Sequence, residues 1–397
     1  MSWEEKMLDE LGVVSRGRSK HRPRNDPSLY DGQYPFIQTA DVKNANFYIT
    51  EYSQTYNEKG LAQSKLWNKG TLCITIAANI ADTGILGMDA CFPDSIMGFI
   101  PYEDKSDVRY VKYCFDILQK DCQQISQGAT QDNLSWKKLS TITFPTPSLK
   151  VQKRIADILS VYDALIENNQ KQIRLLEEAA QRLYKEWFVD LHFPGYENTP
   201  IINGVPQGWR LDEVKSVVSL LSGYAFKSSN FVDNGKYKIV TIKNVQDGNF
   251  DGENVNSIAE IPSKMPTHCI LNDGDILLSL TGNVGRICLV NGENYLLNQR
   301  VAKLNSKYPA YSYCLFRSKE MFDAMNNLAN GAAQQNLSPI RTENMRILIP
   351  NEELINTFEN IVTPMIWKIL LLNKSNGELK QARDRLLPKL MSGELEV

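Results

Sequence analysis

The sequence has few of the residues that build metal sites and disulfide frameworks. It contains only three histidines, His21, His192 and His268, and seven cysteines without a C-x-x-C pair. Structural zinc sites and disulfide-rich domains need cysteines or histidines at short, regular spacings. No apolar run approaches the roughly 18 residues of a membrane-spanning helix, and the first residues, MSWEEKMLDELG, do not resemble a secretion signal. We therefore expect a cytoplasmic protein with reduced cysteines and no bound metal.

The sequence also lacks the common catalytic motifs. It has no GxxxxGKS/T nucleotide loop, no GxGxxG after a strand, no HExxH, and no Asn/Asp-Pro-Pro-aromatic tetrapeptide of amino-methyltransferases. One nuclease-like pattern occurs, Pro93-Asp94 followed by Glu103-Asp104-Lys105, in which carboxylates would hold Mg²⁺. The second half of the chain has no counterpart of it. A PD…ExK nuclease is therefore an alternative that rests on this pattern alone.

The bulk composition is that of an ordinary globular protein. The 397 residues suffice for two or three domains, with 42% hydrophobic and 23% charged residues. The net charge of −2 neither requires nor excludes a nucleic-acid partner, because the local distribution of charge steers a polyanion.

The sequence contains an internal duplication that spans both halves of the chain. The phrase GATQDNLSW (128–136) returns as GAAQQNLSP (331–339), 203 positions later. Such self-similarity is the signature of duplicated structure. Further matches keep the same order, with an offset that drifts only from 206 to 203: Trp3 with Trp209, NKGTLCITIAANI (68–80) with NDGDILLSLTGNV (272–284), and LEEAAQRLYKEWF (176–188) with LKQARDRLLPKLM (379–391).

The local chemistry of the repeated phrase suits the start of a short helix. Ser135 and Ser338 are good N-cap residues, and Pro339 stands at the favoured first helical position. We expect Leu134 and Leu337 to anchor this turn in a core. The phrase is interpreted as a hinge between each globular part and the helix that follows.

Each half ends in a long amphipathic helix. Apolar residues recur at alternating spacings of three and four, which is the heptad pattern of a helix that packs on another helix. The stretch 151–188 would span roughly 55 Å at 1.5 Å per residue; Asn169 is the one polar residue in its seam, and Arg383 is a flaw in the second. The predicted seam residues are Ile155, Leu159, Tyr162, Ile166, Ile173, Leu176, Leu183, Trp187, Phe358, Met365, Ile369, Leu372, Leu379, Leu386 and Leu390.

The rest of each half mixes short alternating or apolar runs with Gly, Asn and Pro, which is typical of an α+β domain. We expect two similar globular domains at opposite ends of an antiparallel two-helix coiled coil, related by a pseudo-two-fold axis. The predicted boundaries are 1–148 and 193–350 for the globular domains, and 149–192 and 351–397 for the helices.

Basic and amide residues indicate where DNA would bind. Arg16, Arg18, Lys20, Arg22 and Arg24 place five cations in nine residues of a predicted loop, where they can contact phosphates or guanine edges. The second half offers a Gly-rich turn, SLTGNVGR (279–286), whose first-half equivalent has no arginine, so the two domains should read different bases. The remaining predicted DNA-binding residues are Asn79, Gln131, Lys227, Lys243, Thr281, Asn283, Arg286, Gln299, Arg300 and Gln334.

As an ensemble, these features resemble the specificity (S) subunits of type I restriction–modification systems. The resemblance covers the whole chain and rests on Pro206-x-Gly208-Trp209, the two GA-x-Q-x-NLS phrases, FPTPSLKVQKRIADIL, LEEAAQRLYKEWFVD and LLPKLMSGELEV. It implies two target-recognition domains that each read one half of a split DNA sequence, held apart by helices that act as a ruler. The target domains of this family vary greatly, so base-reading residues cannot be carried over.

The resemblance further implies a subunit without catalysis or a cofactor of its own. Its partners would be two methyltransferase (M) subunits, which use S-adenosylmethionine, and restriction (R) subunits, which use ATP and Mg²⁺. At 3.4 Å per base pair, a ruler of about 55 Å would place half-sites one to two helical turns apart. The alternative from the residues alone is a stand-alone DNA-binding or scaffold protein.

Overall fold

The computed structural model describes residues 3–77, 80–126, 136–253, 255–329 and 336–397. The chain divides into two compact units. Unit 1 comprises Met1–Asn168 together with Glu378–Val397, and unit 2 comprises Asn169–Gly377. Both mix helices with antiparallel and mixed sheets, which confirms the predicted α+β class. Within the described residues, no helix is long and apolar enough to cross a membrane.

Unit 1 contains two main sheets and a covering helix, α4 (Val108–Ser126). The five-stranded sheet has the order β2 (Gly12–Arg16), β10 (Ile96–Pro101), β7 (Leu72–Thr75), β8 (Thr83–Leu86) and β4 (Tyr48–Ile49). The four-stranded sheet has the order β5 (Gln54–Tyr56), β3 (Tyr30–Phe36), β9 (Ala90–Cys91) and β6 (Leu66–Trp67). The short helices of unit 1 are α1 (Leu8–Leu11), α2 (Thr39–Asn44), α3 (Glu58–Gln63) and α5 (Trp136–Leu139), and α2 links β3 of one sheet to β4 of the other.

Unit 2 repeats much of this arrangement. One sheet has the order β15 (Val218–Ser222), β24 (Val301–Ser306), β21 (Ile276–Ser279) and β22 (Ile287–Leu289). The other has the order β19 (Asn256–Ile258), β16 (Tyr237–Val240), β23 (Tyr295–Leu297) and β20 (Ile270–Leu271). The remaining elements are β12 (Ile201–Ile202), β13 (Val205–Pro206), β17 (Val245–Gln246), β18 (Asn249–Phe250), α7 (Pro309–Arg317), α8 (Lys319–Ala329) and α9 (Pro339–Glu343).

The register of one strand pair shows how closely the repeats correspond. In unit 1, β1 (Glu4–Met7) pairs with β11 (Thr143–Thr146), and Glu5 faces Pro145. In unit 2, β14 (Arg210–Glu213) pairs with β25 (Arg346–Ile349), and Leu211 faces Leu348. Both pairs are antiparallel. Positions 206 and 203 apart in the sequence therefore occupy equivalent places in the two units.

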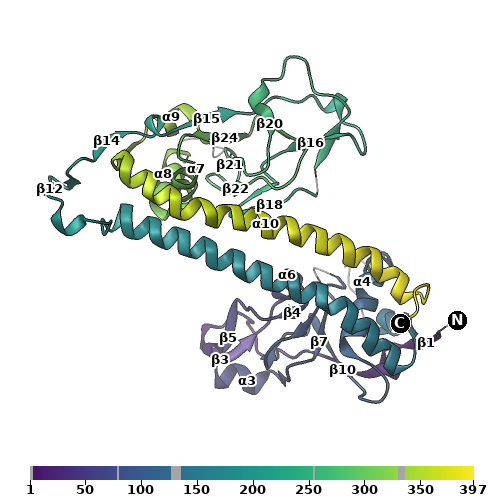
Figure 1. Ribbon diagram of the computed structural model, residues 1–397. Helices are drawn as coiled ribbons and strands as arrows, with labels where there is room; N and C mark the ends of the chain where they lie inside the picture. The colour runs from purple at the N-terminus through teal and green to yellow at the C-terminus, as the bar shows by residue number, and fades with distance from the viewer. Residues whose placement is uncertain (1–2, 78–79, 127–135, 254, 330–335) are drawn as a thin grey trace. The chain divides into compact units, whose positions relative to one another are not determined.

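The long helices are α6 (Leu149–Tyr184), which continues through a π turn at Lys185–Val189, and α10 (Glu352–Met391). They pack side by side (Figure 1), and Pro364 does not interrupt α10. Within unit 2, Trp187 near the end of α6 meets Phe358 near the start of α10, with ring centroids 5.9 Å apart. This pairing of late with early residues makes the helices antiparallel, as predicted. Every predicted seam residue is buried or half-buried.

Arg383 is not a flaw in the seam, and this expectation was wrong. Its Nη1 lies 2.5 Å from Oδ1 of Asp163 on α6, and the Tyr113 hydroxyl of α4 donates to Oδ2 of the same carboxylate at 2.5 Å. Burial raises the pKa of Tyr113, and the charge of Asp163 raises it further, so the phenol stays protonated and donates. The cation thus pairs with a carboxylate that is only 3% exposed, an arrangement that heptad spacing cannot reveal.

Unit 2 ties its α+β part to α6 through a tyrosine, an arginine and a carboxylate as well, with glutamate in place of aspartate. The carboxylate of Glu177 on α6 accepts a hydrogen bond from the Tyr313 hydroxyl at 3.1 Å and pairs with Arg317 at 3.0 Å. Here the arginine comes from α7 rather than from α10. Burial raises the pKa of Tyr313 well above its usual value, which keeps it a donor.

The one amide pair in the seam joins the two helices. Nδ2 of Asn169 donates to Oδ1 of Asn376 at 2.9 Å, and the two residues are 9% and 6% exposed. A buried polar residue in a helix seam favours the register in which it finds its partner, at some cost in stability. Sliding either helix by one turn would leave both amides unsatisfied, so this pair fixes the register of α6 against α10.

Replacing one asparagine of this pair should destabilise the protein more than replacing both. Asn169→Leu leaves the Asn376 amide buried without its partner, which costs about 1–3 kcal/mol, whereas Asn169→Leu/Asn376→Leu restores an apolar seam. The measurement is the urea midpoint, with Asn168→Leu on the exposed face of α6 as the control. A single variant as stable as the wild type would contradict the role of the pair.

Candidate DNA interface

Three chain segments meet at one edge of unit 2. They are called here the first loop (223–230, after β15), the hairpin turn (280–286, between β21 and β22) and the third loop (297–301, between β23 and β24). The backbone joins them through hydrogen bonds from Tyr224 N to Leu297 O (2.9 Å), Gln299 N to Tyr224 O (3.0 Å) and Leu280 N to Arg300 O (3.0 Å). Predicted DNA-binding residues that are distant in sequence thereby share one surface.

Unit 1 builds the same surface from its own first loop (17–24), hairpin turn (76–82, described except for 78–79) and third loop (92–96). Two of these hydrogen bonds have equivalents in unit 1, from Arg18 N to Phe92 O (3.0 Å) and from Ile76 N to Ser95 O (3.0 Å). The bond from Gly17 N to Ile96 O (2.8 Å) matches that from Gly223 N to Val301 O (3.2 Å) in unit 2. The duplicated sequence therefore places matching loops in matching positions, and the side chains decide how the two surfaces differ.

The backbone of the first loop of unit 1 is firmly held. A Cβ on Gly17 would lie 2.2 Å from the carbonyl oxygen of Pro93, so only glycine allows this approach. Oε1 of Gln63 accepts hydrogen bonds from the backbone N–H groups of Lys20 (2.6 Å) and His21 (3.0 Å). These contacts hold the backbone of the loop, and its basic side chains are exposed.

The five cations of this segment are all exposed, but they are not equivalent. Arg24 is paired with Asp94 at 2.6 Å, and Nη1 of Arg22 donates to the carbonyl oxygens of Ser19 and His21. The other three, Arg16, Arg18 and Lys20, make no side-chain hydrogen bond or ion pair with any described residue. They are therefore the cations best placed to bind a phosphate.

The first loop of unit 2 carries aromatic side chains where unit 1 carries cations. Tyr224 and Phe226 are half-buried and contact each other edge to face, with ring centroids 5.1 Å apart. Lys227 is exposed beside them. Aromatic side chains in this position were not predicted; the first loops correspond only through the match of Gly17 with Gly223, and their other residues differ.

The two hairpin turns share a backbone but carry opposite charges. In unit 2, Ser279 N donates to Arg286 O at 3.0 Å, and in unit 1 Thr75 N donates to Asp82 O at 3.0 Å. Asp82 thus stands where unit 2 has Arg286. Burial raises the pKa of Asp82, although its carboxylate accepts a hydrogen bond from Gln119 at 2.7 Å.

Arg286 is held by a neighbour that was missed from the sequence. Its Nη1 donates to Oε1 of Gln246, which ends the short strand β17. Gln246 in turn donates to the carbonyl oxygen of Lys243 at 2.7 Å. The arginine and the amide come from segments 40 residues apart, which no local pattern connects. Together they present a guanidinium and an amide on the same surface.

The other predicted contact residues differ in how far they are exposed to solvent. Asn283, Gln299, Arg300 and Lys243 are exposed. Thr281 is half-buried, and its hydroxyl finds no partner within the described part of the chain. Asn79, Gln131 and Gln334 lie outside the described residues, so their predicted role stays a prediction.

The repeated phrase is not a hinge next to α10. In unit 2, Leu337 is 1% exposed and its N–H donates to Leu280 O of the hairpin turn at 2.8 Å. Ser338 caps α9 as predicted, and β25 follows before α10 begins. The end of the phrase therefore supports the candidate interface. The corresponding part of unit 1 lies largely outside the described residues.

The nuclease-like pattern does not form a metal site. Asp94 precedes β10 and Glu103 follows it, and a six-residue strand is roughly 20 Å long. Asp94 is paired with Arg24 instead. No cluster of three or more histidine, cysteine or acidic residues suited to a metal occurs among the residues that the structure describes. The two carboxylates are too far apart to share one Mg²⁺, so this alternative is wrong.

Comparisons with known proteins identify the family. The model of the type I restriction modification DNA specificity domain matches residues 1–178 and 206–370. The MjaIX specificity subunit of Methanocaldococcus jannaschii is 28% identical over 414 residues, which cover 100% of this chain and 94% of the relative. The HindI specificity subunit of Haemophilus influenzae is 20% identical over 458 residues, which cover 97% of this chain and 98% of the relative.

A solved structure shows the same fold. The S subunit of a type I restriction–modification system from M. genitalium matches with a TM-score of 0.60 and 16% identity, over 98% of this chain and 96% of that one. The duplicated α+β parts and the packed helices α6 and α10 thus correspond to a known architecture. The chain belongs to the family of type I restriction modification DNA specificity domains, and it is a non-catalytic specificity subunit of a type I restriction enzyme.

Proposed function

We propose that this chain reads a bipartite DNA target, one half-site with the surface of unit 1 and the other with the surface of unit 2. The helices α6 and α10 set the spacer and dock two methyltransferase subunits, and through them the restriction subunits. The observation that carries this proposal is the pair of three-segment surfaces, which share backbone hydrogen bonds and differ in side-chain chemistry.

The side chains suit two different modes of contact. Arg16, Arg18 and Lys20 in unit 1 are exposed on an ordered loop. Cations in this setting bind phosphates without the entropic cost of ordering the loop. In unit 2, Arg286 and Gln246 lie together, and arginine and glutamine are the side chains that fork onto guanine and adenine edges in the major groove.

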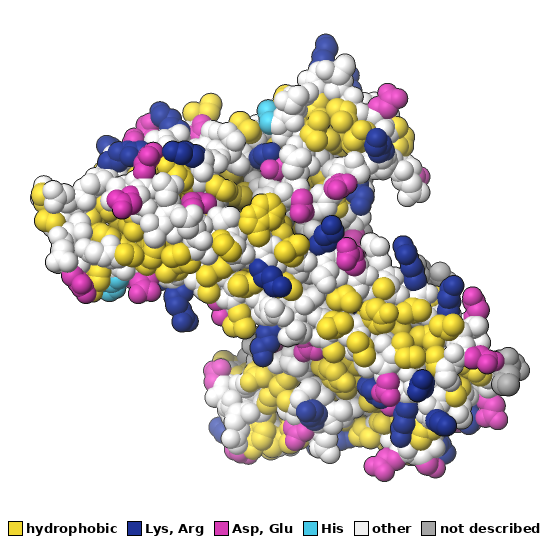
Figure 2. All heavy atoms as spheres, in the orientation of Figure 1, with side chains coloured by type: hydrophobic (Ala, Val, Ile, Leu, Met, Phe, Trp, Pro, Cys, Tyr) yellow, Lys and Arg dark blue, Asp and Glu magenta, His cyan; other side chains and the backbone are white. Residues whose placement is uncertain are grey.

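The outward faces of the helices support docking of other subunits. Trp367 and Leu371 lie one turn apart on α10 and are 56% and 61% exposed; Val161 and Leu165 on α6 are 57% and 44% exposed. Large apolar side chains exposed in neighbouring turns mark a protein–protein contact. Figure 2 shows hydrophobic side chains along the exposed surface of these helices.

Co-expression with the methyltransferase subunit from the same restriction system tests the function. We expect N6-methyladenine to appear at one bipartite motif, because this chain would direct the modification. Single-molecule sequencing of the host DNA is the measurement, with the methyltransferase alone as the control. Absence of any bipartite methylated motif would leave a stand-alone DNA-binding or scaffold protein as the better reading.

Shortening both helices together should change only the spacer. Because Asn169 faces Asn376, deletion of 170–176 from α6 with 369–375 from α10 removes facing heptads and keeps that pair. Seven residues correspond to about 10 Å, or about three base pairs. The methylated motif should keep both half-sites with a shorter spacer; a changed half-site would contradict the ruler.

The unpaired cations of unit 1 should dominate the salt dependence of DNA binding. Arg18→Ala and Lys20→Ala should each lower the slope of log K against log salt by about 1, since each lost phosphate contact releases one counterion fewer. Arg24→Ala is the matched control, because that charge is already paired with Asp94. Fluorescence anisotropy at several salt concentrations measures the slopes. Equal slopes for all variants would remove this loop from the interface.

A further inference from the structure

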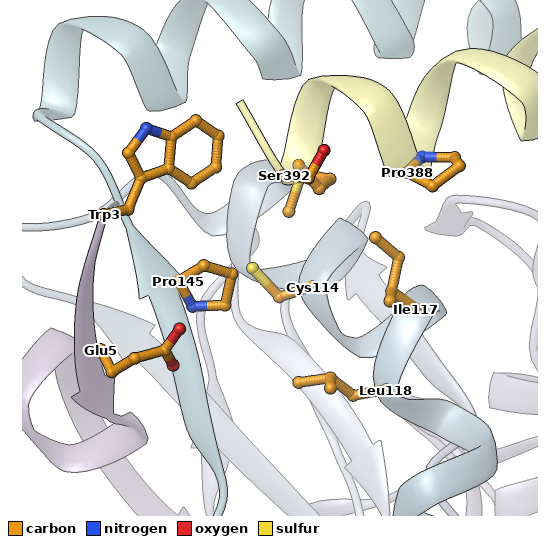
Figure 3. Close-up of a pocket in the computed structure, with 9 residues that line it drawn as sticks. Trp3, Glu5, Cys114, Ile117, Leu118, Pro145, Pro388 and Ser392 are labelled. Carbon is orange, nitrogen blue, oxygen red and sulfur yellow. The ribbon is translucent and has the colours of Figure 1, made fainter. Parts of the chain in front are cut away.

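Unit 1 contains an apolar cavity of about 410 Å³ beside the end of α10. Trp3 and Glu5 form one side of it, and Ile117 and Leu118 of α4 with Pro388 of α10 face them (Figure 3). An apolar cavity of about 150 Å³ is enough to hold a benzene ring. The space is therefore sufficient for an aromatic side chain together with its neighbours.

The internal repeat shows what kind of group belongs in this place. Trp3 is equivalent to Trp209 of unit 2, where Phe193 packs against the indole with ring centroids 5.0 Å apart and Phe188 lies 6.1 Å away. These rings leave Trp209 only 7% exposed, whereas Trp3 is half-buried.

Unit 1 offers smaller or charged groups at the matching positions. At the offset of 203, Phe188 corresponds to Met391, which lines the cavity, and Phe193 corresponds to Glu396, which is exposed. The aromatic partner that covers Trp209 in unit 2 thus has no counterpart on Trp3. The cavity lies where unit 2 has an aromatic cluster.

The rim of the cavity carries an acidic residue without a partner among the described residues, Glu5. Glu5 stands where unit 2 has Leu211, and its carboxylate makes no hydrogen bond or ion pair with any residue that the structure describes. Glu396 is also exposed on a segment that borders the cavity, whereas Glu4 and Glu394 are paired with Lys6 and Lys389. Such a rim repels DNA phosphates and attracts a positively charged partner.

We propose that this cavity binds a peptide segment of the methyltransferase subunit that carries an aromatic side chain next to a basic one. This deepens the proposed function and rests on it. The aromatic ring packs against Trp3 as Phe193 packs against Trp209, and the cation pairs with Glu5. Because Phe188 and Phe193 fill the equivalent place in unit 2, the segment binds at unit 1 and not at unit 2. The two methyltransferase subunits are therefore held in different ways.

The surface around the cavity fits this docking. Ile117 is 40% exposed and Leu395 is 44% exposed. Figure 2 shows hydrophobic side chains gathered over the region of unit 1 that contains α4 and the last turns of α10. An aromatic side chain buried in a pocket, with a charged group at the rim of the pocket, is typical of an interface hot spot.

Photo-crosslinking of the complex tests the proposal directly. The photoreactive residue p-benzoylphenylalanine replaces Ser392, at the cavity, or Leu211, the exposed strand position that matches Glu5, in the full chain co-purified with the methyltransferase subunit. We expect a crosslink from position 392 to a methyltransferase peptide with adjacent aromatic and basic residues, and none to such a peptide from position 211. A crosslink from position 392 to a second copy of this chain, or to a peptide without an aromatic residue, overturns the proposal.

Charge reversal gives an independent measurement. Glu5→Arg should weaken binding of the purified methyltransferase subunit about tenfold, whereas Leu211→Arg should leave it unchanged, as measured by analytical ultracentrifugation. Circular dichroism confirms that both variants fold. Unchanged binding by Glu5→Arg, with bipartite methylation intact, overturns the docking site and leaves the proposed function standing. Failure of the wild-type chain to bind the methyltransferase at all overturns both.

Discussion

The buried contact between α6 and α10 is the constraint on which the rest of the structure depends. An apolar seam alone would allow the helices to slide, since one heptad resembles the next. The Asn169–Asn376 amide pair selects one register in unit 2, and the Asp163–Arg383 ion pair ties α10 to α6 in unit 1. Burying these polar side chains costs free energy when their partners do not meet. The two pairs therefore specify the arrangement rather than add much stability. The proposed function, in which these helices set the spacer between half-sites, requires such a fixed register.

Each unit is attached to these helices through a tyrosine and an acidic residue. Tyr113 with Asp163 and Tyr313 with Glu177 place a phenol against a carboxylate of α6 in both units. Because burial keeps both phenols protonated, the hydrogen bonds persist at physiological pH. These hydrogen bonds hold α4 and α7 against α6 in the two units.

The two copies have kept the same backbone at the candidate interface, while its side chains have diverged. Arg286 and Asp82 occupy the same position of the hairpin turn, and a cationic loop corresponds to an aromatic one. The backbone hydrogen bonds hold the loops whatever the side chains are, which lets each surface recognise a different chemistry. The same divergence left a cavity beside Trp3 where unit 2 has a packed aromatic cluster.

The sequence by itself determined the duplication, the α+β class, the two long helices and the cation-rich loop, because periodicity and repetition are local and linear properties. It could not reveal that Arg383 pairs with Asp163, that Gln246 holds Arg286, or that Asp94 and Glu103 lie at opposite ends of one strand. The repeated phrase was interpreted as a hinge, yet its end in unit 2 supports the hairpin turn. These contacts join segments tens to hundreds of residues apart, and only the packing of strands and helices in three dimensions brings such segments together.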